Sequence, residues 1–415
     1  MRDNAFRDMD GKLTKTLFGS IPLPRFTAPV EASFFKAIRT HENNFNLIRI
    51  ILATTVMFYH AFALNTAARG SLDPASAVLS KFAGIDLGRL AVDMFFVISG
   101  VFVCKSWLED PNLARFGARR VTRLIPGLLF CSLILGLAAM LFFADGGGAP
   151  IFKSAPWIFL LKTSFLADVP NWHISAEYIP VLPGVFPALD IKIFNGSLWS
   201  LIWEARFYII FAVMGVAASL SSLNRTISLA AVSLLLLALM VFSPRLIKLF
   251  VWEFDLFSCF LVGAIITCAA RLLGPSIWIA CFALGGVTSY FEHLAGVLIV
   301  IGAVLLWLGS ARFLFFKSLV NNDYSYGIYI YHWPIMQMIR STFSPLTPLE
   351  LFILTATIAL PMAAISWRFI ERPSMKWVRR FLRRSKDAIG PTVSQHGAGQ
   401  GVPRMSTPAK AKAEP

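Results

Sequence analysis

The first long apolar stretch of the sequence carries two ionisable residues that a membrane rarely tolerates without reason. Arg49 lies near its start, and His60 follows eleven residues later in NFNLIRIILATTVMFYHAFAL. Eleven residues of helix make three turns plus about 20°, so both side chains share one face, about 16 Å apart along the axis. Ionisable groups in hydrocarbon are costly and usually functional. The pair therefore predicts chemistry on a ligand that reaches into the bilayer, with arginine as anchor and imidazole as proton acceptor.

The composition indicates an integral membrane protein. Of 415 residues, 56% are hydrophobic and only 15% are charged, and the mean hydropathy is +0.66. Apolar stretches long enough to cross a bilayer recur along most of the chain, which predicts an all-α polytopic bundle of about ten transmembrane helices. The expected spans are residues 46–65, 84–104, 122–143, 198–219, 226–243, 249–270, 275–290, 293–310, 324–342 and 349–370.

The distribution of positive charge sets the expected orientation. The net charge is +15, and most Lys and Arg residues fall in one alternate set of connections and in the C-terminal run MKWVRRFLRRSK. By the positive-inside rule both termini are expected in the cytoplasm. Arg245 and Lys248 fall in a short loop on the opposite side. No basic stretch is interleaved with a recognisable nucleic-acid-binding fold, so we expect membrane lipids rather than nucleic acid as the partner of these charges.

The chain divides into a cytoplasmic N-terminal tail (1–44), a membrane domain (45–377) and a basic tail (378–415) that we expect to be disordered. An outer loop spans about residues 144–197. Within it, residues 156–167 are too short for a confident span and predict a re-entrant or interfacial helix. The five cysteines show neither metal-ligand spacing nor a disulfide framework. We therefore expect no metal site and no resident cofactor.

An acid lies within the second span. Asp93 occurs in GRLAVDMFFVISG, and two interpretations of it remain open. It is either a structural partner, for example of Arg89 one turn earlier, or a carboxylate that orients His60 and selects its tautomer.

Two arginines lie three residues apart at the expected cytoplasmic end of the third span. Arg120 and Arg123 in ARFGARRVTRLIPG share a helix face. They either set topology and bind lipid phosphates, or bind a polyphosphorylated ligand such as coenzyme A, because guanidinium groups match phosphate oxygens.

Polar residues also mark the fourth span and the last two. Glu204 in SLWSLIWEARFY is expected near the outer surface, where it either pairs with Arg206 or contributes, with its aromatic neighbours, to a sugar-binding surface. His332 lies two residues before Pro334 in DYSYGIYIYHWP, and such a proline loosens a span that lines a cavity. In SWRFIERP we expect Arg368 and Glu371 to pair and Pro373 to end the last helix.

Taken together and in this order, these strings resemble the membrane acyltransferase-3 family of bacterial surface-glycan O-acyltransferases. The resemblance covers roughly residues 44–377. The family's Arg–ten residues–His pattern falls on Arg49 and His60, and its Asp-containing signature on VDMFFVISG. Further matches are the arginine pair at Arg120 and Arg123, the string from Ser197 to Tyr208, and the strings from Tyr324 to Pro334 and from Glu371 to Pro373.

The match has departures. Many members carry two adjacent acids in the fourth-span motif, whereas here the second position is Ala205 and only Glu204 remains. Many also begin the first motif with Leu-Asp-Gly-Leu-Arg, where this chain has Asn46-Leu47-Ile48-Arg49.

The resemblance implies acyl transfer, with acetyl as the default group, from a cytoplasmic acyl-CoA to a hydroxyl of a surface or exported glycan or a lipid-linked saccharide. The enzyme is then expected in the bacterial inner membrane, alongside polysaccharide-biosynthesis partners. The catalytic candidates are His60, Asp93 and Glu204, and the acyl-CoA-binding candidates are Arg49, Arg120 and Arg123. Candidate supporting residues are Ser197, Trp199, Tyr331 and His332. His60 acts either as general base or as the residue that takes the acyl group.

Two other classes of protein share some of these features. A transporter or exporter of a glycan or small acid could use a proton relay through Asp93, His60 and His332, although the spans show no obvious pairing into two repeated halves. A polysaccharide polymerase, a ligase or a non-catalytic complex subunit would also carry a long outer loop rich in aromatic and acidic residues.

Overall fold

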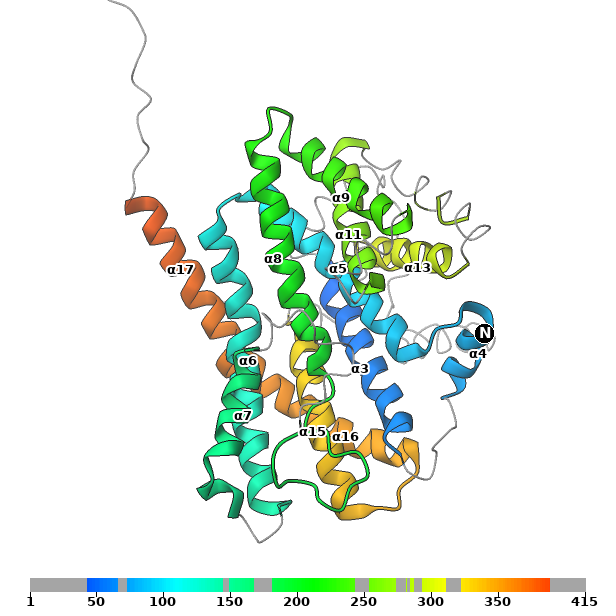
Figure 1. Ribbon diagram of the computed structural model, residues 1–415, viewed down its shortest axis with the longest axis vertical. Helices are drawn as coiled ribbons and strands as arrows, with labels where there is room; N and C mark the ends of the chain where they lie inside the picture. The colour runs from blue at the N-terminus through cyan, green and yellow to red at the C-terminus, as the bar shows by residue number, and fades with distance from the viewer. Residues whose placement is uncertain are drawn as a thin grey trace, which may run out of the picture.

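The computed structural model describes residues 43–65, 73–144, 149–167, 181–242, 254–273, 281, 284–286, 293–310 and 322–388. Within these ranges every regular element is a helix and there is no strand; Ala144 and Val185 form an isolated backbone bridge. The expectation of an all-α architecture is therefore confirmed for the part of the chain that the structure describes (Figure 1).

Six helical segments in the described part are long and apolar enough to cross a bilayer. They are α3 (Phe45–Ala63), α5 (Leu87–Glu109), α6 (Leu113–Phe142), α8 (Leu198–Leu220), α11 (Phe254–Leu273) and the continuous stretch of α16 (Pro348–Ser366), η4 (Trp367–Glu371) and α17 (Arg372–Ala388). The other described helices are α4 (Pro74–Ala83), η2 (Ala149–Phe152), α7 (Ser154–Ser164), α9 (Arg225–Phe242), α13 (His293–Ser310) and α15 (Ser325–Phe343).

Helices occupy most of the expected spans, with one informative shift. α6 begins at Leu113, nine residues before the expected start at 122, because the side chain of Asn112 caps the helix by accepting from the backbone of Arg115. Arg120 and Arg123 are therefore both helical, as expected. Most of the expected span 275–290 lies outside the described residues. The total of about ten spans and the cytoplasmic position of both termini stay predictions.

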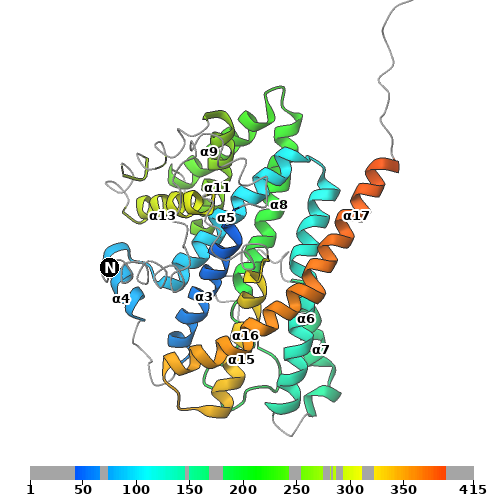
Figure 2. The same cartoon turned by 180° about the vertical axis from the view of Figure 1, so that it is seen from behind.

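The helix α5 crosses the centre of the bundle. It contacts α3, α8, α11 and α13, while α6, α7 and α17 lie on one side and α9, α11 and α13 on the other (Figures 1 and 2). The α5–α11 packing is the closest of these, because two glycines remove the side chains that would separate the helices. A Cβ on Gly100 would meet the carbonyl of Phe260, and a Cβ on Gly263 would meet that of Val97.

We expect Gly100→Ala to lower the thermal unfolding temperature in detergent. The added methyl group must push apart two helix backbones, and such overpacking costs about 1–3 kcal/mol. Gly117→Ala in α6 is the matched control, since a Cβ there would meet no atom within 4 Å and alanine favours a helix by up to about 1 kcal/mol over glycine. An unfolding temperature for Gly100→Ala at or above that of Gly117→Ala would show that the two helices can separate freely.

A short segment ahead of α8 is fastened across α15 through its backbone. Residues 191–195, which we call the strap, offer carbonyl groups to side chains of α15. Trp333 Nε1 donates to the carbonyl of Ile193 at 3.1 Å, and Gln337 Nε2 donates to the carbonyls of Ile191 and Ile193 at 2.7 and 2.9 Å. The strap therefore holds the connection before α8 against the face of α15 that carries Trp333.

The last membrane helix continues beyond the expected stop. We expected Pro373 to end it, but the chain passes through the π-helical turn η4 into α17, which runs to Ala388 beside α6 (Figure 2). Pro373 lies two residues after the π-helical turn, at a point where the helix is continuous. The first residues of the basic tail, 378–388, are thus helical, and 389–415 lie outside the described residues. The expected helix at 156–167 is present as α7.

Candidate functional site

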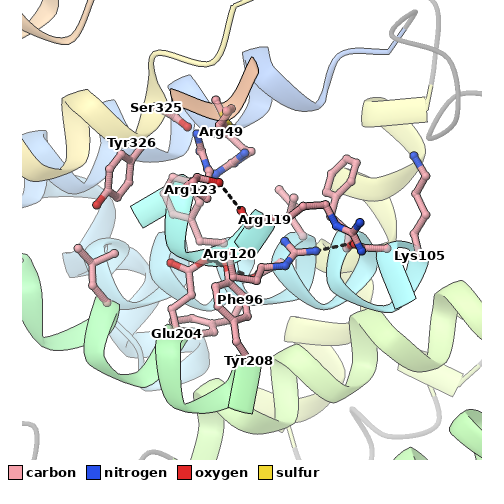
Figure 3. A pocket seen from close by; sticks show the side chains of 18 of the residues that line it. Arg49, Phe96, Lys105, Arg119, Arg120, Arg123, Glu204, Tyr208, Ser325 and Tyr326 are labelled. Carbon is pink, nitrogen blue, oxygen red and sulfur yellow. Dashed lines mark hydrogen bonds between the residues drawn. The ribbon is translucent and has the colours of Figure 1, made fainter. Parts of the chain in front are cut away.

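A cavity of about 410 Å³ opens between α3, α5, α6, α8, α15 and α17. Its walls carry three arginines that sequence patterns singled out, Arg49, Arg120 and Arg123, together with Glu204. Figure 3 shows these side chains converging from three helices. The arginine of the first span and the arginine pair of the third therefore contribute to one site.

Arg49 and Arg123 meet at a shared carboxylate. Asp323 Oδ2 lies 2.6 Å from a terminal nitrogen of Arg49 and 2.8 Å from one of Arg123. Asp323 directly precedes α15, and Ser325 Oγ donates to its other oxygen at 2.5 Å. Sequence reasoning missed Asp323, although it opens the quoted string DYSYGIYIYHWP; an acid beside a tyrosine-rich helix start was the available signal.

A second acid reaches Arg123 from the opposite direction. Glu371 Oε2 lies 3.8 Å from a terminal nitrogen of Arg123, and its other oxygen accepts from Ser366 Oγ at 2.9 Å. We expected Glu371 to pair with Arg368, three residues earlier on an α-helix. The π-helical turn η4 widens the helix at these residues, so the expected α-helical stacking is lost.

Arg120 has different surroundings from the other two arginines. Its guanidinium lies 5.2 Å from the ring centres of both Phe116 and Tyr208, and one terminal nitrogen donates to the carbonyl of Phe102 at 3.4 Å. Its Nε is buried without a hydrogen-bond partner among the described residues. Aromatic faces hold a guanidinium in place without neutralising it, so Arg120 is suited to meet an anion.

Asp110 and Arg119 line the cavity where α5 is followed by α6, and Arg115 joins them from outside the cavity wall. Asp110 accepts hydrogen bonds from Arg115 at 2.6 and 2.9 Å and from Arg119 at 2.8 Å. The bonds from Arg115 lower the pKa of Asp110 to about 2; burial opposes this shift and Arg119 adds to it. Asp110 therefore stays ionised at neutral pH and fixes the orientation of these two guanidinium groups.

Glu204 lies among the arginines instead of at the far end of the bundle. It accepts from the hydroxyl of Tyr208, one turn along α8, and from Ser99 Oγ at 3.4 Å. We expected it near the outer surface beside an acceptor. The structure places it in the cavity wall because its face of α8 turns toward α5 and α6 (Figure 3).

His60 and His332 are in direct contact. Nδ1 of His60 lies 2.8 Å from Nε2 of His332, and Ser197 Oγ lies 3.4 Å from the same Nε2. The edge of Trp333 packs against the His60 ring at 4.7 Å between centres. Tyr331 is fully buried, and as the sequence neighbour of His332 it projects about 100° away around the helix.

The histidine pair and the cavity are linked through α8 and α15. Ser200, one turn after Ser197, and Tyr329, one turn before His332, both line the cavity, and their hydroxyl oxygens are 2.7 Å apart. The pair therefore lies about one helical turn beyond the cavity wall. This hydroxyl contact was another feature that sequence reasoning missed.

Asp93 belongs to a different cluster. It accepts from Arg89 Nε at 3.3 Å, and the Arg89 guanidinium also lies 3.7 Å from Asp255 and 5.7 Å from the Trp199 ring centre. Of the two interpretations of Asp93, the contact with Arg89 is the one that the structure shows. The side chain that contacts His60 is that of His332. Trp199 likewise lies in the Arg89 cluster. In the described part, no group of three His, Cys, Asp or Glu side chains is placed to share a metal ion.

Comparison with known proteins places the chain in a family. The model of the family described as "Acyltransferase domain" matches residues 42–367, a range that includes Arg49, Arg120, Arg123 and the His60–His332 pair. No solved structure matches the chain.

Curated relatives agree with the family match. Nodulation protein 10 of Rhizobium leguminosarum bv. viciae is 26% identical over 369 residues, covering 81% of this chain and 94% of that protein. The O-acetyl transferase of Shigella phage Sf6 is 26% identical, covering 84% and 99%. O-acetyltransferase OatA of Staphylococcus aureus is also 26% identical, but the match covers 70% of this chain and 53% of that protein. Since the described part contains six helices apolar enough to cross a bilayer, the chain is a membrane enzyme, and it belongs to the acyltransferase family whose domain it carries across residues 42–367.

Proposed function

We propose that the protein is an O-acyltransferase of the bacterial inner membrane. It moves an acyl group, with acetyl as the first choice, from cytoplasmic acyl-CoA to a hydroxyl of a surface or exported glycan or of a lipid-linked saccharide. The names of two relatives, an O-acetyl transferase and an O-acetyltransferase, support the reaction class. The observation that carries the proposal is the single cavity that gathers Arg49, Arg120 and Arg123 about one helical turn from the His60–His332 pair.

The donor is assigned from the chemistry of the cavity. Coenzyme A carries phosphate groups at one end and its thioester at the end of a flexible arm. Guanidinium groups bind phosphate oxygens with charge-assisted hydrogen bonds. Five arginines of the described part line the cavity: Arg49, Arg119, Arg120, Arg123 and Arg379. His60 lies eleven residues beyond Arg49 on α3, about 16 Å along the helix, which is a distance that the pantetheine arm can cover.

The reaction needs a base or an acyl carrier at the thioester. As a base, His60 takes the proton of the acceptor hydroxyl, whose oxygen attacks the thioester carbonyl; the carbon–sulfur bond breaks and the coenzyme A thiolate takes the proton. As a carrier, His60 forms a bond to the acyl carbon while the carbon–sulfur bond breaks and coenzyme A leaves as a thiolate. The acceptor hydroxyl then attacks the acyl carbon, the bond to His60 breaks, and the hydroxyl proton goes to the thiolate. Both routes use the same imidazole.

The proposal is tested on surface glycans. A strain lacking the gene, and the same strain complemented with the wild-type gene, are compared by mass spectrometry of their glycans. We expect loss of an acyl mass from one sugar and its return on complementation. Unchanged acylation with altered glycan chain length would point to a polymerase or ligase instead. Solute flux into vesicles that contain no acyl-CoA would point to a transporter.

Asp323→Asn provides a further prediction about the donor site. The substitution leaves the partly buried guanidinium groups of Arg49 and Arg123 without their shared charge, so we expect the free energy of unfolding to fall by about 2 kcal/mol. Because coenzyme A phosphates replace the missing negative charge, added coenzyme A should raise the unfolding temperature more in the variant than in the wild type.

The control for this prediction removes an ion pair far from the cavity. Asp190 lies 2.8 Å from Arg340, at the opposite end of α15 from Asp323. Asp190→Asn should also lower the unfolding temperature, with no extra gain from coenzyme A. If coenzyme A stabilises Asp323→Asn no more than wild type, Arg49 and Arg123 do not bind the donor phosphates.

A further inference from the structure

The proton positions on the histidine pair follow from one carbonyl group. Nδ1 of His332 lies 3.0 Å from the carbonyl oxygen of Ile328, one turn earlier on α15. A carbonyl oxygen can only accept, so Nδ1 of His332 carries a hydrogen. In a neutral imidazole the other nitrogen then holds a lone pair and accepts. Nε2 of His332 is therefore an acceptor.

The same assignment of donor and acceptor nitrogens applies to His60. Its Nδ1 lies 2.8 Å from this Nε2. Because the Nε2 lone pair accepts, Nδ1 of His60 must donate, which leaves the lone pair of His60 on its own Nε2. Ser197 Oγ, 3.4 Å from His332 Nε2, is a second donor to the same acceptor. The chain of hydrogen bonds thus runs from His60 through His332 to the backbone of α15.

The two rings differ in access. His332 is fully buried, whereas His60 is partly exposed. The His60 ring is nearly parallel to that of His332, with an interplanar angle of 15°, and meets the edge of Trp333 at 81°. A ligand can therefore reach His60 while His332 and Trp333 hold its orientation.

We propose that His332 is the positioning residue that fixes the tautomer of His60, so that Nε2 of His60 is the nitrogen that reacts. This inference rests on the proposed function. His60 takes either a proton from the acceptor or the acyl group from the donor, and in both cases the new bond forms at Nε2. The hydrogen on Nδ1 keeps its hydrogen bond to Nε2 of His332. A neutral imidazole fills the place that a carboxylate often takes beside a catalytic histidine. It does so without adding a second charge inside the membrane, where charges are costly.

The kinetic test compares His332→Gln with His332→Leu in the full-length protein in detergent, using acetyl-CoA and the unacylated glycan from the strain that lacks the gene. A glutamine can place its side-chain oxygen near the position of Nε2 and accept from His60, whereas leucine cannot. We expect His332→Leu to lower kcat about 30-fold with the KM for acetyl-CoA little changed, and His332→Gln to stay within about fivefold of wild type. Equal losses in both variants, or wild-type kcat in His332→Leu, would overturn the proposal.

A second measurement does not depend on activity. The chain has only six histidines, so nitrogen-15 labelling of histidine gives a tractable NMR spectrum, and His60→Ala identifies the His60 signals. We expect the protonated type of signal from Nδ1 and the lone-pair type from Nε2 of His60, with the two tautomers mixing in His332→Leu. The reverse assignment contradicts the inference. Because this spectrum is recorded without substrate, a wrong tautomer is distinguishable from a wrong function, which the glycan analysis reports.

Discussion

His60→Ala should reduce acyl transfer by at least about 10³-fold, because it removes the imidazole that serves as base or acyl carrier. The described rings that meet His60 are those of Tyr59, His332 and Trp333. Tyr59 and Trp333 carry no basic nitrogen, and His332 is fully buried. The measurement is transfer of labelled acetyl from acetyl-CoA to the glycan, with the amount of inserted protein determined in the same membranes.

The matched control is Ile51→Ala, on the same helix but 55% exposed on its surface. This variant should insert and accumulate like wild type and keep its activity, since it shortens a side chain that contacts neither the cavity nor the histidine pair. Full acylation by His60→Ala at wild-type protein levels would remove His60 from the reaction.

The double substitution Arg120→Ala with Arg123→Ala is the second variant with a large expected effect. Each guanidinium–phosphate contact contributes about 1.5–3 kcal/mol, so losing two should lower kcat/KM for acetyl-CoA at least about 100-fold, mostly through KM. Arg120 and Arg123 are substituted together because both side chains line one cavity and neither contacts His60.

A truncated donor separates binding from folding. S-acetylpantetheine has the thioester arm but no phosphates, so the double variant should use it as well as the wild type does. Arg115→Ala is the control on the same helix, because Arg115 contacts Asp110 and does not line the cavity. This variant should still use acetyl-CoA in preference to S-acetylpantetheine, as the wild type does. If the double variant loses activity equally with both donors, the arginines support structure rather than phosphate binding.

Helical periodicity explains which parts of the site could be predicted. It shows that Arg49 and His60 share one face of α3, and that Arg120 and Arg123 share one face of α6, because 3.6 residues per turn determine which side chains lie together. It does not show which helices are neighbours. The contact between His60 and His332 joins residues 272 positions apart, and the bridge from Asp323 to Arg123 spans 200; no local pattern encodes either.

The errors have the same origin. Glu204 was expected near the outer surface from its place in the sequence of α8, and its true setting depends on which face of α8 meets α5 and α6. Glu371 was paired with Arg368 on the assumption of α-helical spacing, which the π-helical turn breaks. The number of spans depends partly on residues that the structure does not describe, so about ten stays a prediction.

The strap has a consequence for how such an enzyme diversifies. Trp333 and Gln337 hold it through the carbonyl groups of Ile191 and Ile193, and every amino acid supplies a carbonyl. Lys192 is exposed and can therefore be exchanged without loosening the anchorage, whereas Ile191 and Ile193 also pack against the hydrophobic core. Mutational drift can thus remodel the surface beside the histidine pair while the reacting nitrogen stays in place, which is a route to new acceptor preferences at little cost to stability.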